Sequence, residues 1–213
     1  MVGEWGGGAS VCENRLTVES LPKPTGVAPM ASEDVLMWLE KSKSGISTAI
    51  KIRLRFWSIF GVFLFKHCPI SRWRIYLLNL FGAKIDLSSF VHSSAQIYMP
   101  WNLEMGRMSS IDFNSIIYCL DKIKIGDFVS IAYCANVNTG FHDLSDPHFQ
   151  LKTRSVSIED GAFIGTGAYL SPGVRIGKMA VIGAQSTVTR DMPSGFICYG
   201  TPCTPRRKRE KNT

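Results

Sequence analysis

The sequence lacks most of the short motifs by which enzymes are usually identified. It has no glycine-rich phosphate loop of the Walker or dinucleotide type and no Gly-x-Ser-x-Gly segment, which removes the sequence signals for those nucleotide-binding folds and for hydrolases of that kind. The six cysteines, at positions 12, 68, 119, 134, 198 and 203, include no Cys-x-x-Cys pair and no histidine at zinc spacing. We therefore expect free thiols in the reducing cytoplasm.

Long apolar runs are also missing. The longest spans residues 56–65, about half of the roughly 20 residues that a membrane-spanning helix needs, and the N-terminus has no apolar signal-peptide core after a basic start. The apolar content of 45% is enough for the core of one domain. The net charge of +7 favours an anionic partner. Because the basic residues are dispersed and accompany no recognised motif, we expect no nucleic acid binding.

The N-terminal part divides into two segments. Residues 1–31 are rich in Gly, Pro and Ser without a sustained period, which is typical of a flexible tail. Residues 32–84 are expected to be helical, with a first helix that begins near Ser32. Within them, residues 46–81 combine apolar and basic side chains. We expect one or two helices that cover the end of the following domain; the alternative is a peripheral contact with a membrane, at its inner face.

Residues 158–193 repeat with a period of six. Each block opens with an apolar leader, and a small or branched side chain follows four residues later. This period fits neither a helix nor simple strand alternation and predicts a parallel β-helix in which three blocks make one triangular coil. The leaders point inward, the small residues fill the corner regions, and Gly161, Gly167 and Gly173 fall in turns. The leaders are Ile158, Ile164, Leu170, Ile176, Ile182 and Val188, and the small residues are Ala162, Ala168, Val174, Ala180 and Ser186.

The same pattern extends toward the N-terminus and predicts about five coils over residues 85–193. The further leaders are Ile85, Val91, Ile97, Met105, Ile111, Ile117, Ile125, Ile131 and Val137. Residues 138–157 break the pattern and must leave the coils as a loop, on a face that solenoids often use for binding. Residues 194–213 form a last segment with a basic tail that is either solvated or helps to hold phosphate.

The predicted loop carries the best catalytic candidate. His142 follows Thr139-Gly140-Phe141, and Asp143 and Asp146 come soon after it. A carboxylate near an imidazole can fix its tautomer and stabilise its protonated form, as a general base requires. By itself an isolated histidine more often only satisfies loop backbone, but its place in the loop of a hexapeptide solenoid favours catalysis.

The chain resembles the hexapeptide-repeat acyltransferases, and within them the colanic acid biosynthesis acetyltransferase type. The likeness runs from about residue 72 to 204. It is carried by WRIYLLNLFGAKI (73–85), PWNLEMG (100–106), IGDFVSI (125–131), TGFHDLSDPHF (139–149), IGAQSTVTRDMP (182–193) and YGTP (199–202).

The resemblance implies a left-handed β-helix that forms a homotrimer and uses acetyl-CoA without a metal. It implies that His142 is the general base, with Asp143 and Asp146 as the acidic residues beside it, and that the acceptor is a sugar or polysaccharide precursor. It places the C-terminal coils at the cofactor. The implied cofactor-binding residues are Gly165, Thr166, Gly183, Ala184, Thr189 and Arg190, with Arg206 and Arg207 near the adenosine 3′-phosphate.

Three other functions stay open at this point. An acetyltransferase of the same fold could act on a small xenobiotic hydroxyl compound. A metal enzyme of the γ-carbonic-anhydrase kind would need three histidines gathered at subunit contacts; His142 and His148 are six residues apart and His92 belongs to a distant coil, which disfavours it. A non-catalytic scaffold would tolerate the loss of His142.

Overall fold

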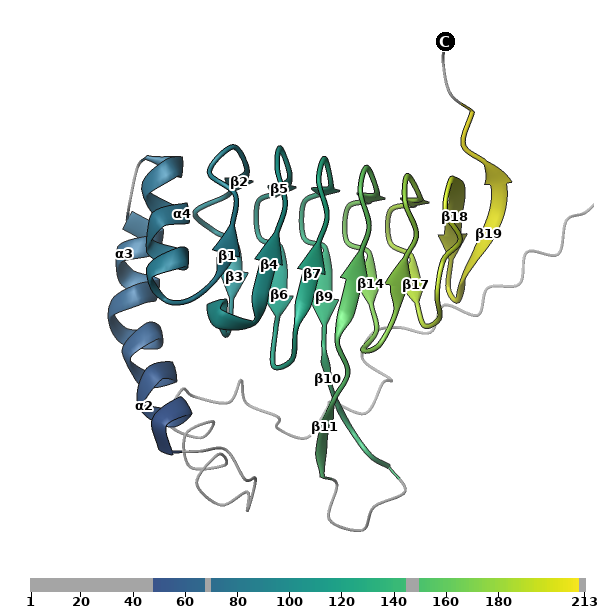
Figure 1. Ribbon diagram of the computed structural model, residues 1–213. Coiled ribbons are helices and arrows are strands. Elements are labelled where there is room, and N and C mark those ends of the chain that lie inside the picture. The colour runs from purple at the N-terminus through teal and green to yellow at the C-terminus, as the bar shows by residue number, and fades with distance from the viewer. Residues whose placement is uncertain (1–47, 68–69, 145–149, 211–213) are drawn as a thin grey trace, which may run out of the picture. The chain divides into compact units, whose positions relative to one another are not determined.

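The computed structural model describes residues 48–67, 70–144 and 150–210. The chain separates into two units, residues 1–44 and 45–213, and all described residues belong to the second. In that unit, helices lie at one end of a long β-helix from which a hairpin protrudes (Figure 1). The predicted tail, residues 1–31, and the helix predicted to begin near Ser32 lie outside the described residues.

Three parallel sheets form the faces of the β-helix, and each coil contributes one strand to each face. The first sheet contains β1 (Lys84–Ile85), β4 (Leu103–Met105), β7 (Ile123–Ile125), β12 (Val156–Ile158) and β15 (Arg175–Ile176). The second contains β2 (Phe90–Val91), β5 (Ser110–Ile111), β8 (Ser130–Ile131), β13 (Phe163–Ile164), β16 (Val181–Ile182), β18 (Phe196–Gly200) and β19 (Cys203–Lys208). The third contains β3 (Gln96–Ile97), β6 (Ile116–Tyr118), β9 (Asn136–Asn138), β14 (Tyr169–Leu170) and β17 (Thr187–Val188).

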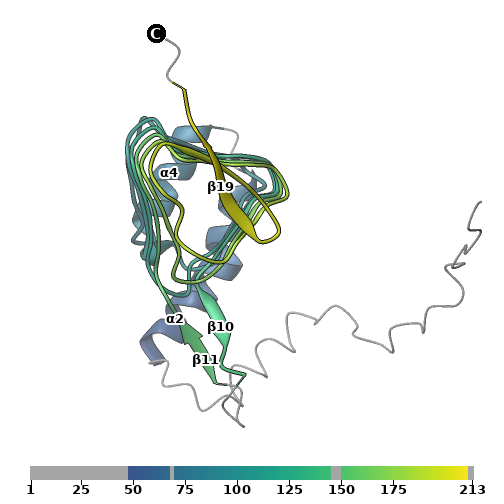
Figure 2. The ribbon, with the colours of Figure 1, turned by 90° about the vertical axis from the view of Figure 1, so that its right-hand side faces the viewer.

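The predicted inward pattern is confirmed. Every predicted leader is at most 5% exposed, and equivalent leaders stand opposite one another in neighbouring coils, as Ile131, Ile164 and Ile182 do. The small residues of the C-terminal coils, from Ala162 to Ser186, are buried as well. The hexads therefore produce a closed triangular section (Figure 2), and the buried leaders fill its interior.

The turns share one backbone conformation. Gly161, Gly167 and Gly173 adopt φ of 67°, 65° and 90° at the position three residues after a leader. The same position carries a side chain in other turns, such as Phe128 at φ 57° and Met179 at φ 58°. The tight corner requires the left-handed region, which glycine adopts most easily. The sequence analysis predicted only those turns that contain glycine at this position.

The β-helix is longer than the predicted range, residues 85–193. After β17, Met192 bridges to Ile176 in the first sheet, and β18 pairs in parallel with β16 in the second. A sixth turn is thus begun, and β19 closes it by folding back antiparallel on β18. The hexad pattern ends before this turn because β18 is longer and continues into a hairpin.

The helices cover the open edge of the first coil. A helix runs through α2 (Thr48–Phe56), a π-helical segment (Trp57–Gly61) and α3 (Val62–His67), and α4 (Ser71–Leu80) follows. Trp57 is buried and its Nε1 donates to the Ile97 carbonyl at 2.9 Å, while Arg74 Nε donates to the Val91 carbonyl at 3.0 Å. Strand carbonyls at this edge thereby gain partners, which an exposed sheet edge would leave to solvent or to another chain.

A buried thiol makes the stability of the fold depend on pH. Cys119 is fully buried, where its Sγ donates to the Met99 carbonyl at 3.2 Å. Burial raises the pKa of this thiol to about 11, whereas an unfolded thiol has a pKa of about 8.5. The folded state keeps the proton longer, so its free energy of unfolding is highest below pH ~8.5 and falls as the pH rises toward 11.

We expect this thiol to cost the wild type about 2 kcal/mol of unfolding free energy between pH 8 and pH 10. Urea unfolding at both pH values measures the loss. The free energy of unfolding of the variant Cys119→Ala should fall less between these pH values, because alanine has no ionisable thiol at position 119. Equal losses in the two proteins would show that Cys119 does not titrate as proposed.

Candidate active site

His142 lies on the hairpin that leaves the β-helix after the third coil. The hairpin consists of β10 (Gly140–His142) and β11 (Leu151–Thr153), which pair antiparallel with His142 opposite Leu151. It projects away from the solenoid axis (Figures 1 and 2). The predicted loop, residues 138–157, is thus a two-stranded arm whose last residues already belong to β12. His142 is exposed on this arm, so a substrate can reach its imidazole.

The base of the hairpin is fixed to the coil beneath it. Thr139 is fully buried; its Oγ1 donates to the Tyr118 carbonyl at 2.8 Å and accepts from the Asp121 amide at 3.0 Å. Asn138 Nδ2 donates to the Tyr169 hydroxyl at 3.1 Å, and its Oδ1 accepts from the Gly140 amide at 2.8 Å. These bonds set the direction in which β10 leaves, three residues before His142.

The anchoring by Thr139 can be measured. In the variant Thr139→Val the Asp121 amide loses its acceptor inside the protein, and we expect a loss of about 1–3 kcal/mol of unfolding free energy. Urea unfolding gives this value. The matched control is Thr153→Val on the exposed side of the same hairpin, which should stay within about 0.5 kcal/mol of wild type. Equal effects of the two variants would contradict the anchoring.

Two close contacts hold the strands of the hairpin around His142. Lys152 Nζ lies 2.5 Å from Asp143 Oδ2, so the carboxylate next to the histidine forms an ion pair across the strands. The guanidinium of Arg154 lies 4.9 Å from the centre of the Phe141 ring, a cation–π distance. Asp146 and His148 lie outside the described residues.

Four of the proposed cofactor-binding residues come together at one corner, between the second and third sheets. Gly165 and Gly183 follow the paired leaders Ile164 and Ile182, so Thr166 stands next to Ala184 in successive coils. A Cβ on Gly165 would lie 2.7 Å from the Ala184 amide nitrogen. The coils therefore approach here as closely as glycine permits. Gly165 is buried and Gly183 half-buried, while Thr166 and Ala184 are exposed.

The last hairpin extends this corner toward the C-terminus. A Cβ on Gly183 would lie 2.8 Å from the Cβ of Tyr199. The Arg206 guanidinium lies 5.2 Å from the centre of the Tyr199 ring. Arg206 thus places a positive charge beside the glycine corner, as a phosphate group would require.

The remaining predicted residues lie elsewhere on the C-terminal coils. Thr189 and Arg190 are exposed just after β17, at the corner between the third and first sheets. Arg207 stands opposite Ile197 in the β18–β19 hairpin. The His142 hairpin leaves from the corner after β9, so the third sheet separates it from the Gly165 and Gly183 corner. Within one copy, the proposed base and the proposed cofactor corner lie on different corners of the prism.

Within the described ranges, no group of three or more His, Cys, Asp or Glu side chains could hold a metal ion. His92, one of the histidines that a metal site would need, lies on the first coil and its Nδ1 is 2.8 Å from Ser94 Oγ. None of the helices among these residues is both long and apolar enough to span a bilayer.

Comparison with known proteins gives the family. The family "Bacterial transferase hexapeptide (six repeats)" matches residues 155–190. The "Putative colanic acid biosynthesis acetyltransferase WcaF" of Escherichia coli is 33% identical over 162 residues, which cover 76% of this chain and 88% of that protein. The chain belongs to the hexapeptide-repeat acetyltransferases. This confirms the resemblance carried by the hexads and the loop segment.

Solved structures of hexapeptide-repeat acetyltransferases share the fold. A maltose O-acetyltransferase from Clostridium difficile superposes with a TM-score of 0.69 at 25% identity, over 78% of this chain and 90% of its own. A hexapeptide-repeat acetyltransferase from Vibrio cholerae, complexed with acetyl coenzyme A, gives 0.72 at 24% identity, over 78% and 92%.

The sequence analysis missed several residues that contact the candidate site residues of this hexapeptide-repeat acetyltransferase. Thr139 and Asn138 anchor the hairpin. Lys152 forms an ion pair with Asp143, and the Arg206 guanidinium lies over the ring of Tyr199. Asn138 and Thr139 are the first residues of the predicted loop, but only the packing of the third coil shows what they contact. Lys152 stands nine positions after Asp143, and the antiparallel register alone brings them together.

Proposed function

We propose that this protein transfers an acetyl group from acetyl-CoA to a hydroxyl of a sugar or polysaccharide precursor, of the exopolysaccharide or capsule type. The observation that carries the proposal is the exposed imidazole of His142 on an anchored hairpin, in a chain of this family. The acceptor class is supported by the names of the relatives, a colanic acid acetyltransferase and a maltose O-acetyltransferase.

The proposed chemistry is a direct transfer in which His142 acts as general base. The imidazole takes the proton of the acceptor hydroxyl as its oxygen attacks the thioester carbonyl carbon. The new C–O bond forms, the C–S bond breaks, and the proton passes from the imidazolium to the leaving thiolate. The products are an O-acetyl ester and CoA. Asp143 is the proposed acidic residue next to His142, and its ion pair with Lys152 holds the carboxylate in place.

On this proposal the glycine corner holds the acyl donor. Thr166 and Ala184 are exposed where the coils approach closely at Gly165 and Gly183, which suits an extended pantetheine arm. Backbone N–H groups near the thioester can stabilise the oxyanion. Arg206 on Tyr199, together with Arg207, would pair with the adenosine 3′-phosphate. Thr189 and Arg190 would contact the donor from the neighbouring corner.

A homotrimer is part of the proposal, because a neighbouring copy can bring a His142 hairpin to the corner of Gly165 and Gly183. Within one copy these two corners lie apart. If prisms associate side by side, the hairpin of one copy can reach the glycine corner of the next. A cyclic assembly repeats this pairing at every interface. The cytoplasm fits the four cysteines described, Cys119, Cys134, Cys198 and Cys203, all of which are free thiols.

Ligand-dependent melting tests the proposal. We expect acetyl-CoA and CoA to raise the melting temperature of the purified protein and zinc to leave it unchanged. A ligand at 100 times its Kd adds about 2.7 kcal/mol to the free energy of unfolding. An acceptor screen by thiol release then separates sugars from small xenobiotic hydroxyl compounds. No shift with either coenzyme would favour the non-catalytic scaffold.

A further inference from the structure

The helical end of the molecule exposes an unusual amount of apolar surface. On α2, the π-helical segment and α3, the side chains of Ile52, Ile59, Phe60 and Phe63 are 54–65% exposed, and on α4 those of Trp73 and Leu80 are 62% and 81% exposed. Contiguous apolar patches beyond a few hundred Å² are rare on monomeric soluble proteins and mark interaction sites. We call this surface the outer face of the helices.

The outer face is not needed to hold the helices on the β-helix. Leu54, Trp57, Gly61 and Phe65 are spaced three or four residues apart and form the inward stripe. A Cβ on Gly61 would lie 2.0 Å from the Trp57 ring, so the ring is closely packed against this glycine on the inner side. The exposed apolar side chains stand on the rest of the helix circumference. Core packing therefore explains the inner stripe and leaves the outer face to another partner.

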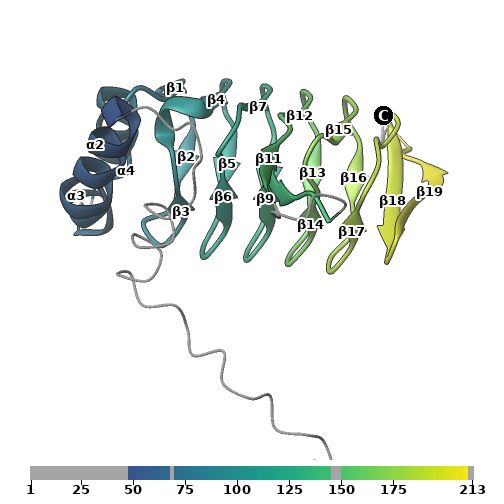
Figure 3. The same cartoon turned by 90° about the horizontal axis from the view of Figure 1, so that it is seen from below.

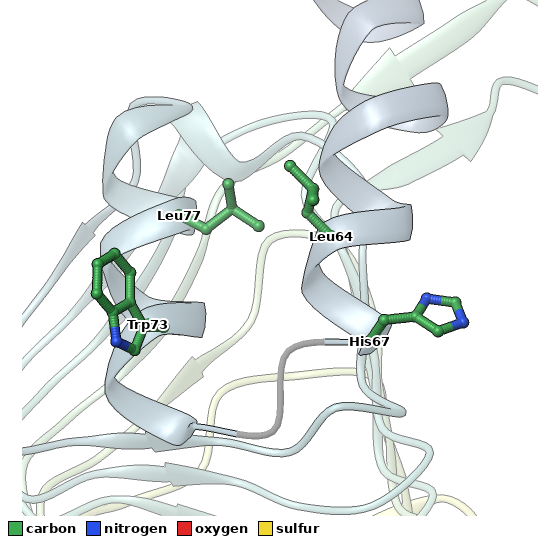
Figure 4. Close-up of a pocket in the computed structure, with 4 residues that line it drawn as sticks. All are labelled: Leu64, His67, Trp73 and Leu77. Atoms are coloured by element: carbon green, nitrogen blue, oxygen red, sulfur yellow. The ribbon is translucent and has the colours of Figure 1, made fainter.

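A groove joins the two helices on this side. Leu64 of α3 and Leu77 of α4 point toward one another (Figure 4), and together with His67 and Trp73 they line a space of about 360 Å³. Figure 3 shows these helices together at the end of the coils, beyond β2 and β3. The apolar side chains of α3 and α4 thus form one surface with a shallow groove in it.

The charges around the outer face are all of one sign. No aspartate or glutamate occurs between Glu40 and Asp86. Lys51, Arg55, Lys66 and Arg72 are exposed, and the ion pairs found among the described residues include none of these four side chains. An apolar surface surrounded by cations is complementary to a lipid bilayer with anionic headgroups.

We propose that the outer face of the helices binds the surface of an anionic lipid bilayer. The apolar side chains insert at the level of the acyl boundary, the four cations contact the headgroups, and Trp73 and Tyr76 lie at the interface that their amphipathic rings favour. The proposal concerns attachment alone and does not depend on the reaction at His142.

Two other occupants are less suitable. A second copy across a two-fold axis would bring the same four cations toward one another. The acidic N-terminal residues are the other competitor, since residues 1–40 carry six acidic and two basic side chains. The helix predicted to begin near Ser32 and to end within residues 41–45 would be at most about 21 Å long, against about 30 Å for residues 48–67. It would leave part of the outer face open.

Vesicle flotation of the full chain tests the proposal. We expect binding to vesicles of phosphatidylcholine mixed with phosphatidylglycerol to be at least tenfold stronger than to phosphatidylcholine alone, and to weaken as salt is raised. The variant Phe63→Gln should bind roughly tenfold less, because it removes an aromatic ring that would become buried in the bilayer on binding. The matched control is Phe128→Gln: both rings are 61% exposed, but Phe128 lies on a coil turn. It should bind as wild type.

Charge variants and the catalytic variant complete the design. Arg55→Gln and Arg72→Gln should each lower binding roughly fivefold, and Lys124→Gln on the first sheet should not. His142→Ala should bind vesicles like wild type, so a failure of the proposed chemistry stays distinct. The proposal is overturned if the full chain floats with neither vesicle, or if Phe63→Gln and Phe128→Gln lower binding equally. A change of oligomeric mass on Phe63→Gln in light scattering, without loss of vesicle binding, would assign the face to a second copy and also overturn it.

Discussion

Replacing His142 by alanine should lower kcat/KM for acetyl transfer by about 10²–10⁴-fold, the range expected for a positioned general base. The imidazole is exposed at the end of β10, and the bonds of Thr139 and Asn138 fix the hairpin below it. On the proposed mechanism, removing the imidazole leaves the acceptor hydroxyl without a group that takes its proton, while the proposed donor corner stays intact. Release of CoA thiol, measured with the acceptor found in the screen, gives the ratio.

The matched control for this variant is His67→Ala. His67 is also exposed, but it lies at the end of α3, where its Nδ1 is 2.9 Å from the Phe63 carbonyl oxygen. This control should keep kcat/KM within a factor of about two, as a surface change away from the site allows. Both variants should melt at a higher temperature with CoA, as wild type does. If His142→Ala keeps most of its activity, the proposed direct mechanism is wrong. That conclusion holds even if CoA raises the melting temperature and the fold and donor binding are confirmed.

Mixing two inactive variants should restore activity if His142 of one copy acts at the glycine corner of the next. The first variant is His142→Ala. The second is Ala184→Trp, which puts an indole over the corner where the pantetheine is proposed to lie; Ala184 is exposed, so the larger ring does not have to enter the core. Each variant alone has no complete site in such an assembly.

In mixed rings about one quarter of the sites combine a normal His142 with a normal corner, because each site draws one part from each of two neighbouring copies. Activity should rise from below about 1% for either variant to about one quarter of wild type after co-expression. A mixture of the two proteins assembled separately controls for free exchange. Rings that stay inactive after co-expression would mean that base and corner act within one chain, or that the corner is not the donor site.

Much of the fold could be read from local spacing. The leaders from Ile85 to Val188 recur with the geometry of one short strand and one turn, and each coil contacts only its neighbours, so the period alone identifies the architecture. Both the loop and His142 were visible as an interruption of that period. The helical end was visible as a change of composition. The turns with Phe128 or Met179 at positive φ were not predicted, because neither residue type is typical of that backbone conformation.

The candidate site was only partly predictable. Gly165, Thr166, Gly183 and Ala184 were placed by the resemblance, and stacking of the coils brings them to one corner. Tyr199 joins them because β18 continues the second sheet into a sixth turn, which breaks the hexad pattern. Asp143 was expected beside the histidine, but its pairing with Lys152 depends on the antiparallel register of the hairpin.

The sequence by itself thus determined the repeating coil, its interruption and the residue types on it, because hexads are local and each encodes its own strand and turn. The tertiary structure decided which of those residues meet. It separated the His142 hairpin from the glycine corner by a whole sheet, and it turned Trp57 and Phe65 inward while leaving Phe63 and Trp73 on the outer face. These contacts depend on how the coils stack and the helices pack. Contacts between residues far apart in the chain produce no period in the sequence, so the sequence alone does not predict them.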